Sequence, residues 1–132
     1  MIVSVGCDHG GYDLKEKIKS YLEGKSITVI DEGTYSTESC DYPIFAEKVA
    51  LDVVKGKAEY GIVCCTTAEG ICIASNKVKG IRCGIGFHDD ATKGLRAHNN
   101  GNMIAFSSSS ADLLKEKCEK ALTEKNIADD VH

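Results

Sequence analysis

Apolar residues along the chain form five short runs, each followed by a polar loop or an amphipathic segment. The runs cover residues 2–5, 27–30, 61–64, 81–87 and 103–106. They are nearly continuous rather than alternating, which is typical of strands buried on both faces of a parallel sheet. The pattern therefore predicts five buried strands.

Helical periodicity fills the segments between these runs. In residues 12–24, Leu14, Ile18 and Leu22 recur on one face, and the lysines and glutamates are expected on the opposite, solvated face. Pro43 is the only proline and suits the first turn of a second helix. Further helices are expected around residues 71–77, over residues 89–98, and after four serines at residues 107–110.

Strands and helices thus alternate five times with short links. This order predicts one α/β domain over residues 1–132, a three-layer αβα sandwich with a five-stranded parallel Rossmann-like sheet. If the strand order begins 2-1-3 with right-handed crossovers, the ends of the first and third strands lie side by side, where open α/β sheets bind ligands.

Composition narrows the possible partners. Apolar residues make up 42% and charged residues 27% of the chain, as in ordinary globular proteins. The net charge of −4 argues against nucleic-acid and membrane partners. No apolar run reaches membrane-spanning length, and the first residues lack a basic leader, so we expect a cytoplasmic protein.

The chain contains seven cysteines, an odd number, with no C-x-x-C pair. Cys64, Cys83 and Cys118 fall on predicted buried positions and are interpreted as small core residues. No Cys or His pair has the spacing of zinc ligands, so we expect no metal.

Residues 60–77 read as a buried strand, a loop of small and polar residues, and a helix start. Such loops expose free backbone N–H groups that can hold an anion or a reacting carbonyl. Cys65 falls at the carboxyl end of the strand. A single cysteine at such a position is more often structural than catalytic.

Two other polar clusters are expected at the same edge of the sheet. Asp8 and His9 follow the first strand, and His98 and Asn99 lie in a turn before the last strand. A thiol, a carboxylate and two imidazoles make an acid–base site plausible. Asp8 equally suits a helix cap, and both histidines suit surface loops.

Four motifs occur in order along residues 1–106: G-C-D-H-G-G from residue 6, D-E-G-T-Y-S-T-E-S-C-D-Y-P from residue 31, A-S-N-K-V-K-G-I-R from residue 74, and R-A-H-N-N-G-N from residue 96. Together they resemble the ribose-5-phosphate isomerase B family. That family also contains allose-6-phosphate isomerases and galactose-6-phosphate isomerase subunits.

The resemblance implies a role for each matching residue. Cys65 is placed on the catalytic base that moves a proton between C1 and C2 of the sugar, and Thr67 on the threonine that assists it. His98 matches the residue assigned to ring opening, with Asp8 as its acid–base counterpart. The implied reaction is aldose–ketose isomerisation through a cis-enediolate, with no metal or cofactor.

The resemblance also implies substrate contacts and an assembly. The family site lies at a homodimer interface, so a homodimer, possibly a tetramer, is expected to bind a sugar phosphate. The implied substrate-binding residues are His9, Tyr42, Thr66, Ala68, Glu69, Gly70 and Asn99.

The loop departs from the family pattern C-G-T-G-[IV]-G. Thr66 and Ala68 replace glycines, and each adds a Cβ and a penalty for positive φ. Glu69 replaces an apolar residue and brings a negative charge. Some members carry a catalytic glutamate where this chain has Ile71, so the chain resembles the cysteine type.

The arginines that bind phosphate in the family are missing. This chain has only Arg82 and Arg96, and no arginine follows the last predicted strand. Lysine lacks the bidentate geometry of arginine, so Lys115, Lys117 or His132 would compensate only in part.

Two hypotheses remain open. The favoured one is an aldose–ketose isomerase that converts ribose 5-phosphate to ribulose 5-phosphate, or a variant acting on a six-carbon or unphosphorylated sugar. The other is a non-catalytic sugar-phosphate-binding subunit that retains the fold.

Overall fold

The computed structural model describes residues 1–108, in which five parallel strands form one sheet in the order β2-β1-β3-β5-β4. The expected start of this order, 2-1-3, is confirmed, as is the α/β fold class. The strands are β1 (Ile2–Cys7), β2 (Thr28–Asp31), β3 (Tyr60–Cys65), β4 (Cys83–Ile85) and β5 (Met103–Ser107).

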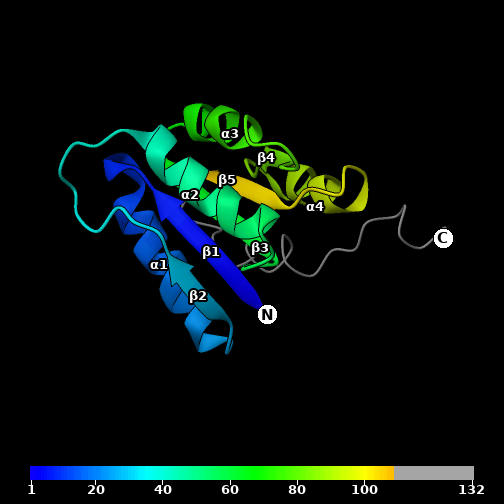
Figure 1. The fold of residues 1–132 in the computed structure, drawn as a ribbon, viewed down its shortest axis with the longest axis horizontal. Helices are drawn as coiled ribbons and strands as arrows, with labels where there is room; N and C mark the ends of the chain where they lie inside the picture. Colours follow the sequence, from blue (N-terminus) through cyan, green and yellow to red (C-terminus); the bar gives the residue numbers. More distant parts are fainter. Residues whose placement is uncertain (109–132) are drawn as a thin grey trace.

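Helices cover both faces of the sheet (Figure 1). The core on one face joins α1 to the sheet, with Leu95 of α4 packed against it; the core on the other face is formed with α2 and α3. The helical elements are η1 (His9–Gly11), α1 (Tyr12–Gly24), α2 (Tyr42–Val54), α3 (Glu69–Asn76) and α4 (Asp89–Ala97).

Side chains of β1 show how the sheet serves both cores. Val3 and Val5 are fully buried against the α1 face, and each contributes roughly 1.5–3 kcal/mol by its burial. Ser4 and Gly6 point to the α2 face. This two-sided burial explains why the strands read as nearly continuous apolar runs.

The fourth strand is shorter than predicted. Residues 81–87 were expected to be extended, but only Cys83–Ile85 pair with β5. This strand lies at the sheet edge, and the chain then turns into α4, whose first turn is capped by His88 Nδ1 accepting from the Ala91 N–H at 3.0 Å.

The predicted burial of Cys64 and Cys83 is confirmed. Cys118 and the helix expected after residue 110 lie outside the described residues. Within residues 1–108, none of the helices combines the length and the apolar character needed to cross a membrane.

Candidate active site

The carboxyl ends of β1 and β3 lie side by side and bring Asp8 close to the Cys65 loop. Cys7 pairs in register with Cys64, and the Asp8 N–H donates to the Cys64 carbonyl at 3.3 Å. Asp8, which follows β1, therefore lies beside Cys65 at the end of the neighbouring strand β3. This part of the predicted convergence is confirmed.

Cys65 is the last residue of β3, and its thiol is held inside the loop. The Sγ atom accepts a hydrogen bond from the Ala68 N–H at 3.0 Å, and the residue is 6% exposed. Ala68 has φ +70°, in the left-handed region. The turn thus folds back so that a backbone amide at the start of α3 points at the sulfur.

The expected backbone penalty falls on only one of the two replaced glycines. It is confirmed at Ala68, which is fully buried with a positive φ. It is wrong for Thr66, which has no positive φ. The Thr66 side chain instead occupies the space above Gly10, where any added Cβ would collide with its Oγ1.

Thr67 and Glu69 lie on the exposed side of the loop. The Glu69 N–H donates to Thr67 Oγ1 at 3.4 Å. Glu69 is the first residue of α3, where the helix dipole favours a negative charge. Its carboxylate therefore has a local structural role at this position.

Asp8 serves as a helix cap, which was one of its two predicted roles. Its Oδ1 accepts from the Gly11 N–H at 3.0 Å and closes the η1 turn. This cap fixes the carboxylate beside β3. A capping role and an acid–base role are compatible, because the cap occupies one carboxylate oxygen.

Residues 32–41 bring His9 and Tyr42 to the same edge. The Cys40 N–H donates to His9 Nδ1 at 3.2 Å, while the His9 ring stays exposed. The Tyr42 ring covers Gly70, where an added Cβ would lie 2.8 Å from the ring. A groove of about 310 Å³ runs from Tyr42 and Gly70 along α3 to Lys77.

The prediction that the lysines of α1 face solvent is wrong for Lys15. It is fully buried and donates to Asp31 Oδ1 at 2.8 Å and to the Thr34 carbonyl at 2.6 Å. Burial opposes its charge, but the hydrogen bond and the charge of Asp31, with smaller contributions from Cys7 and Glu16, together raise the pKa of Lys15. Spacing was the missed signal, since residues 15, 18 and 22 share one helical face.

The same ion pair acts on its neighbours. Burial opposes the charge of Asp31, yet the hydrogen bonds from Lys15, Gly33 and Lys19, with the Lys15 charge, together lower the pKa of the Asp31 carboxyl. Burial raises the pKa of the Cys7 thiol to about 12, despite the nearby Lys15 charge. Cys7 therefore stays protonated, and it is not a candidate base.

A second polar cluster, unforeseen from the sequence, lies beneath α2. The Ser4 hydroxyl donates to Asp52 Oδ2 at 2.8 Å, and both residues are buried. Asp52 also shares a hydrogen bond with Glu32, which follows β2. That hydrogen bond, together with burial, raises the pKa of Glu32 to about 7. Ser4, the single polar residue inside the first apolar run, was the feature of the sequence that could have indicated this cluster.

His98 and Asn99 do not join this edge within one chain. They follow α4 and precede β5, and the Gly61 N–H donates to the Asn102 carbonyl at the start of both strands. Cys65 pairs with Ser107 at the other end. Strand geometry separates these ends by roughly 15 Å. The predicted convergence of all three clusters is therefore wrong for a single chain.

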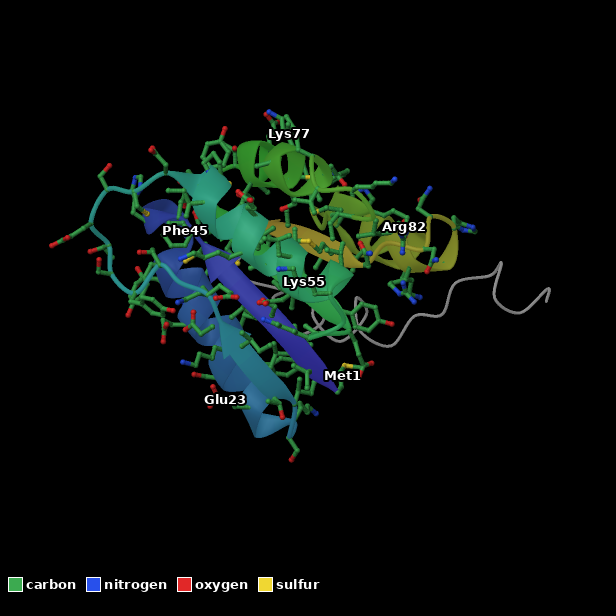
Figure 2. All side chains as sticks on the ribbon, in the orientation of Figure 1. Met1, Glu23, Phe45, Lys55, Lys77 and Arg82 are labelled. Atoms are coloured by element: carbon green, nitrogen blue, oxygen red, sulfur yellow. The ribbon has the colours of Figure 1, made fainter. Side chains whose placement is uncertain are left out.

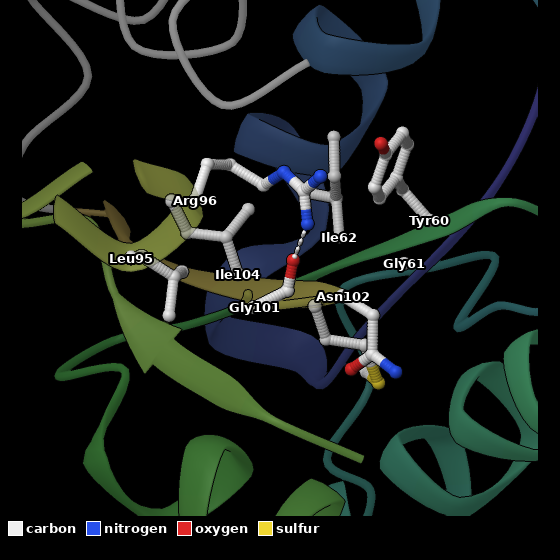
Figure 3. A pocket seen from close by; sticks show the side chains of 9 residues that line it. Tyr60, Gly61, Ile62, Leu95, Arg96, Gly101, Asn102 and Ile104 are labelled. Carbon is white, nitrogen blue, oxygen red and sulfur yellow. Dashed lines mark hydrogen bonds between the residues drawn. The ribbon is translucent and has the colours of Figure 1, made fainter. Parts of the chain in front are cut away.

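Both arginines also lie at the amino edge. Arg96 donates to the Gly101 carbonyl and lies 4.9 Å from the Tyr60 ring centroid (Figure 3). Arg82 donates to the Asn100 carbonyl at 2.6 Å, and Figure 2 shows it far from Phe45 at the start of α2. Neither arginine of residues 1–108 is near Cys65.

No set of three or more Cys, His, Asp or Glu side chains in residues 1–108 is arranged to hold a metal ion. The carboxyl edge presents a thiol, a carboxylate, an imidazole, hydroxyl groups and backbone amides.

Known proteins share this architecture and sequence. The Ribose/Galactose Isomerase family model matches residues 3–130. The chain belongs to the ribose/galactose isomerase family. Its fold and its sugar-phosphate isomerase motifs are those of this family.

The relatives include two different named activities. Ribose-5-phosphate isomerase B of Escherichia coli is 42% identical over 80% of this chain and 71% of its own length. The galactose-6-phosphate isomerase subunit LacB of Clostridium acetobutylicum is also 42% identical, over 80% of this chain and 61% of its own length.

The solved structure of Clostridium thermocellum ribose-5-phosphate isomerase B superposes with a TM-score of 0.93 at 39% identity. The match covers 96% of this chain and 86% of that one.

Proposed function

We propose that this chain is an aldose–ketose isomerase that interconverts ribose 5-phosphate and ribulose 5-phosphate, with Cys65 as the base. One observation carries the proposal. Cys65 ends β3 beside Asp8, and its sulfur accepts a hydrogen bond from the Ala68 N–H at 3.0 Å. The similarity to named ribose-5-phosphate isomerases supports the choice of substrate.

In the proposed reaction, His98 and Asp8 open the sugar ring. The Cys65 thiolate then removes the proton from C2 of the open-chain aldose, and the electrons move onto the C1 oxygen to form a cis-enediolate. Thr67 shuttles the proton between the sugar oxygens, and backbone amides of the loop stabilise the developing negative charge. Return of the proton to C1 gives the ketose, so no atoms are gained or lost.

We further propose that the site is completed in a homodimer. Cys65 and Asp8 lie at the carboxyl edge of the sheet, whereas His98 and Asn99 lie at the amino edge. A second copy that presents its amino edge to the first would supply the two missing residues. His9 and Tyr42 would then contact the phosphate end and the body of the sugar from the first copy, with Thr66, Ala68, Glu69 and Gly70 as the floor of the pocket.

A second candidate is a subunit with altered or lost activity. The equal similarity to a galactose-6-phosphate isomerase subunit favours it. Such a subunit would bind a sugar phosphate without isomerising it, whereas a variant of the isomerase would act on a six-carbon sugar phosphate or on a sugar without phosphate. In either case we place the protein in cytoplasmic carbohydrate metabolism, with the pentose phosphate pathway as the setting of the ribose-phosphate reaction.

Hydrogen exchange at C2 tests the proposed reaction directly. The protein is incubated with ribose 5-phosphate, allose 6-phosphate, galactose 6-phosphate or the free sugars in D₂O, and loss of the C2–H signal is followed by NMR. We expect exchange with ribose 5-phosphate, and a loss of roughly 10²–10⁴-fold in Cys65→Ala.

Cys64→Ala is the matched control, because Cys64 is the adjacent buried thiol but faces α1. It should retain exchange. Exchange with none of the sugars would favour the binding subunit, and equal losses in both variants would rule out Cys65 as the base.

A further inference from the structure

Cys72 of α3 and Cys83 of β4 contact each other away from the Cys65 loop. The Cys72 thiol lies 3.4 Å from the Cys83 carbonyl oxygen and shares a side-chain hydrogen bond with the Cys83 thiol. Both cysteines are free in this structure. The fold thus places two reduced thiols in contact across the α3–β4 packing.

Asn76 holds this contact in place. Its amide oxygen accepts from the Cys83 N–H at 2.8 Å, and its Nδ2 donates to the Cys83 carbonyl at 2.8 Å. The same Nδ2 lies 3.7 Å from Cys72 Sγ. Because one side chain binds both the N–H and the carbonyl of Cys83 and reaches the Cys72 sulfur, the two cysteines have a fixed relative position.

The two thiols have different environments. Cys72 is partly exposed, whereas Cys83 is 9% exposed. Their hydrogen bond lowers the pKa of Cys72 to about 7 and, with burial, raises the pKa of Cys83 far above its ordinary value. An accessible, partly ionised thiol beside a buried protonated one matches the attacking and resolving cysteines of thiol–disulfide exchange.

We propose that Cys72 and Cys83 form an oxidisable dithiol that a small-molecule disulfide converts into a disulfide linking α3 to β4. This dithiol is separate from the proposed isomerase base, so its existence does not depend on the proposed function. Because α3 begins directly after the Cys65 loop, the link would fix the helix that supplies the loop amide.

The exchange balances in two steps. The Cys72 thiolate attacks one sulfur of glutathione disulfide, the S–S bond breaks, and one glutathione leaves and takes up a proton. Cys83 then loses its proton and attacks Cys72 Sγ, which releases the second glutathione. The two cysteines lose two electrons and two protons, and glutathione disulfide gains them.

The test equilibrates the full chain with glutathione and glutathione disulfide at increasing ratios of the disulfide, blocks free thiols with N-ethylmaleimide and analyses peptides by mass spectrometry. We expect loss of two of the seven alkylatable thiols and a peptide linked through Cys72 and Cys83. Cys72→Ser and Cys83→Ser should each abolish the link, whereas Cys40→Ser, which removes another partly exposed thiol, should retain it.

A second measurement uses the unsubstituted chain, so its result does not depend on whether the variants fold. The rate of Cys72 alkylation by iodoacetamide should reach half its maximum near pH 7, and at neutral pH it should exceed that of an ordinary thiol roughly fivefold. Retention of all seven thiols in excess glutathione disulfide, a link between other cysteines, or an alkylation midpoint near pH 9 would each overturn the proposal.

Discussion

The two edges of the sheet carry different halves of the candidate chemistry. At the carboxyl edge, Cys65 and Asp8 are held by short backbone hydrogen bonds to the turns around them. At the amino edge, His98 and Asn99 are exposed, and the nearby arginines bind backbone carbonyls of the same turn. One chain therefore presents the proposed catalytic residues at opposite ends of one sheet, and in the proposed homodimer a second copy would bring them together.

The edges also differ in how they are anchored. The carboxyl edge is stabilised by the fully buried Lys15 and its partner Asp31. The amino edge is held by contacts of exposed side chains such as Arg82. Removing an anchor should thus cost more stability at the carboxyl edge.

Lys15→Met should give the largest effect. It leaves Asp31, which is only 13% exposed, with the partly exposed Lys19 at 3.3 Å as its remaining charged partner, so the free energy of unfolding should fall by roughly 3 kcal/mol. Arg82→Met, the control at the amino edge, should cost less than about 1 kcal/mol. Urea unfolding midpoints of the two variants provide the measurement, and equal losses would remove the difference in anchoring.

Much of this arrangement was accessible from the sequence. The five apolar runs and Leu14, Ile18 and Leu22 predicted the sheet and α1, because burial on both faces leaves a clear pattern. The position of His98 was foreseeable too, since a turn between a helix and the next parallel strand lies at the amino edge. The prediction from the sequence instead placed His98 at the carboxyl edge, beside Cys65.

The acidic cluster should give a smaller, pH-dependent effect. The folded chain binds the Glu32 proton more tightly than the unfolded chain, whose ordinary pKa is 4.5. Its stabilising contribution is therefore fully present below about pH 4.5 and is lost as the pH rises through about 7. Asp31 acts in the opposite sense, but only on acidification below its ordinary pKa of 3.8.

Thermal unfolding between about pH 5 and about pH 8 measures this loss. Glu32→Gln should flatten the decline of the melting temperature, and Glu59→Gln, at an exposed position, should leave it unchanged. An unaltered decline in Glu32→Gln would show that its proton is not the cause. Lys48 and Lys57 oppose the shift, so the slope should steepen when either is replaced by Met.

The smallest effect is expected at Ala68. Glycine relieves the cost of φ +70° there, which offsets the lost burial of the methyl group, so stability should stay within about 0.5 kcal/mol. Ala50→Gly, at an equally buried position inside α2, has no such relief and should cost roughly 1–2 kcal/mol. Equal costs in chemical denaturation would mean that Ala68 carries no backbone strain.

Other features depend on tertiary contacts that local patterns do not encode. Ser4, Glu32 and Asp52 come from three elements, and only packing brings their oxygens together. Thr66 has no positive φ, whereas Ala68 has a left-handed φ and its amide donates to the Cys65 sulfur. Residue type alone predicted the same penalty for both.

Complementation between two inactive variants tests most directly whether the site is built from both edges of two chains. Cys65→Ala and His98→Ala are each expected to lose isomerase activity as pure proteins. When the two are unfolded, mixed and refolded together, half of the dimers contain both variants, and each of these has one intact site. If the site is shared between two chains, activity should recover to about a quarter of that of the unsubstituted protein. A mixture no more active than the separate variants would contradict it.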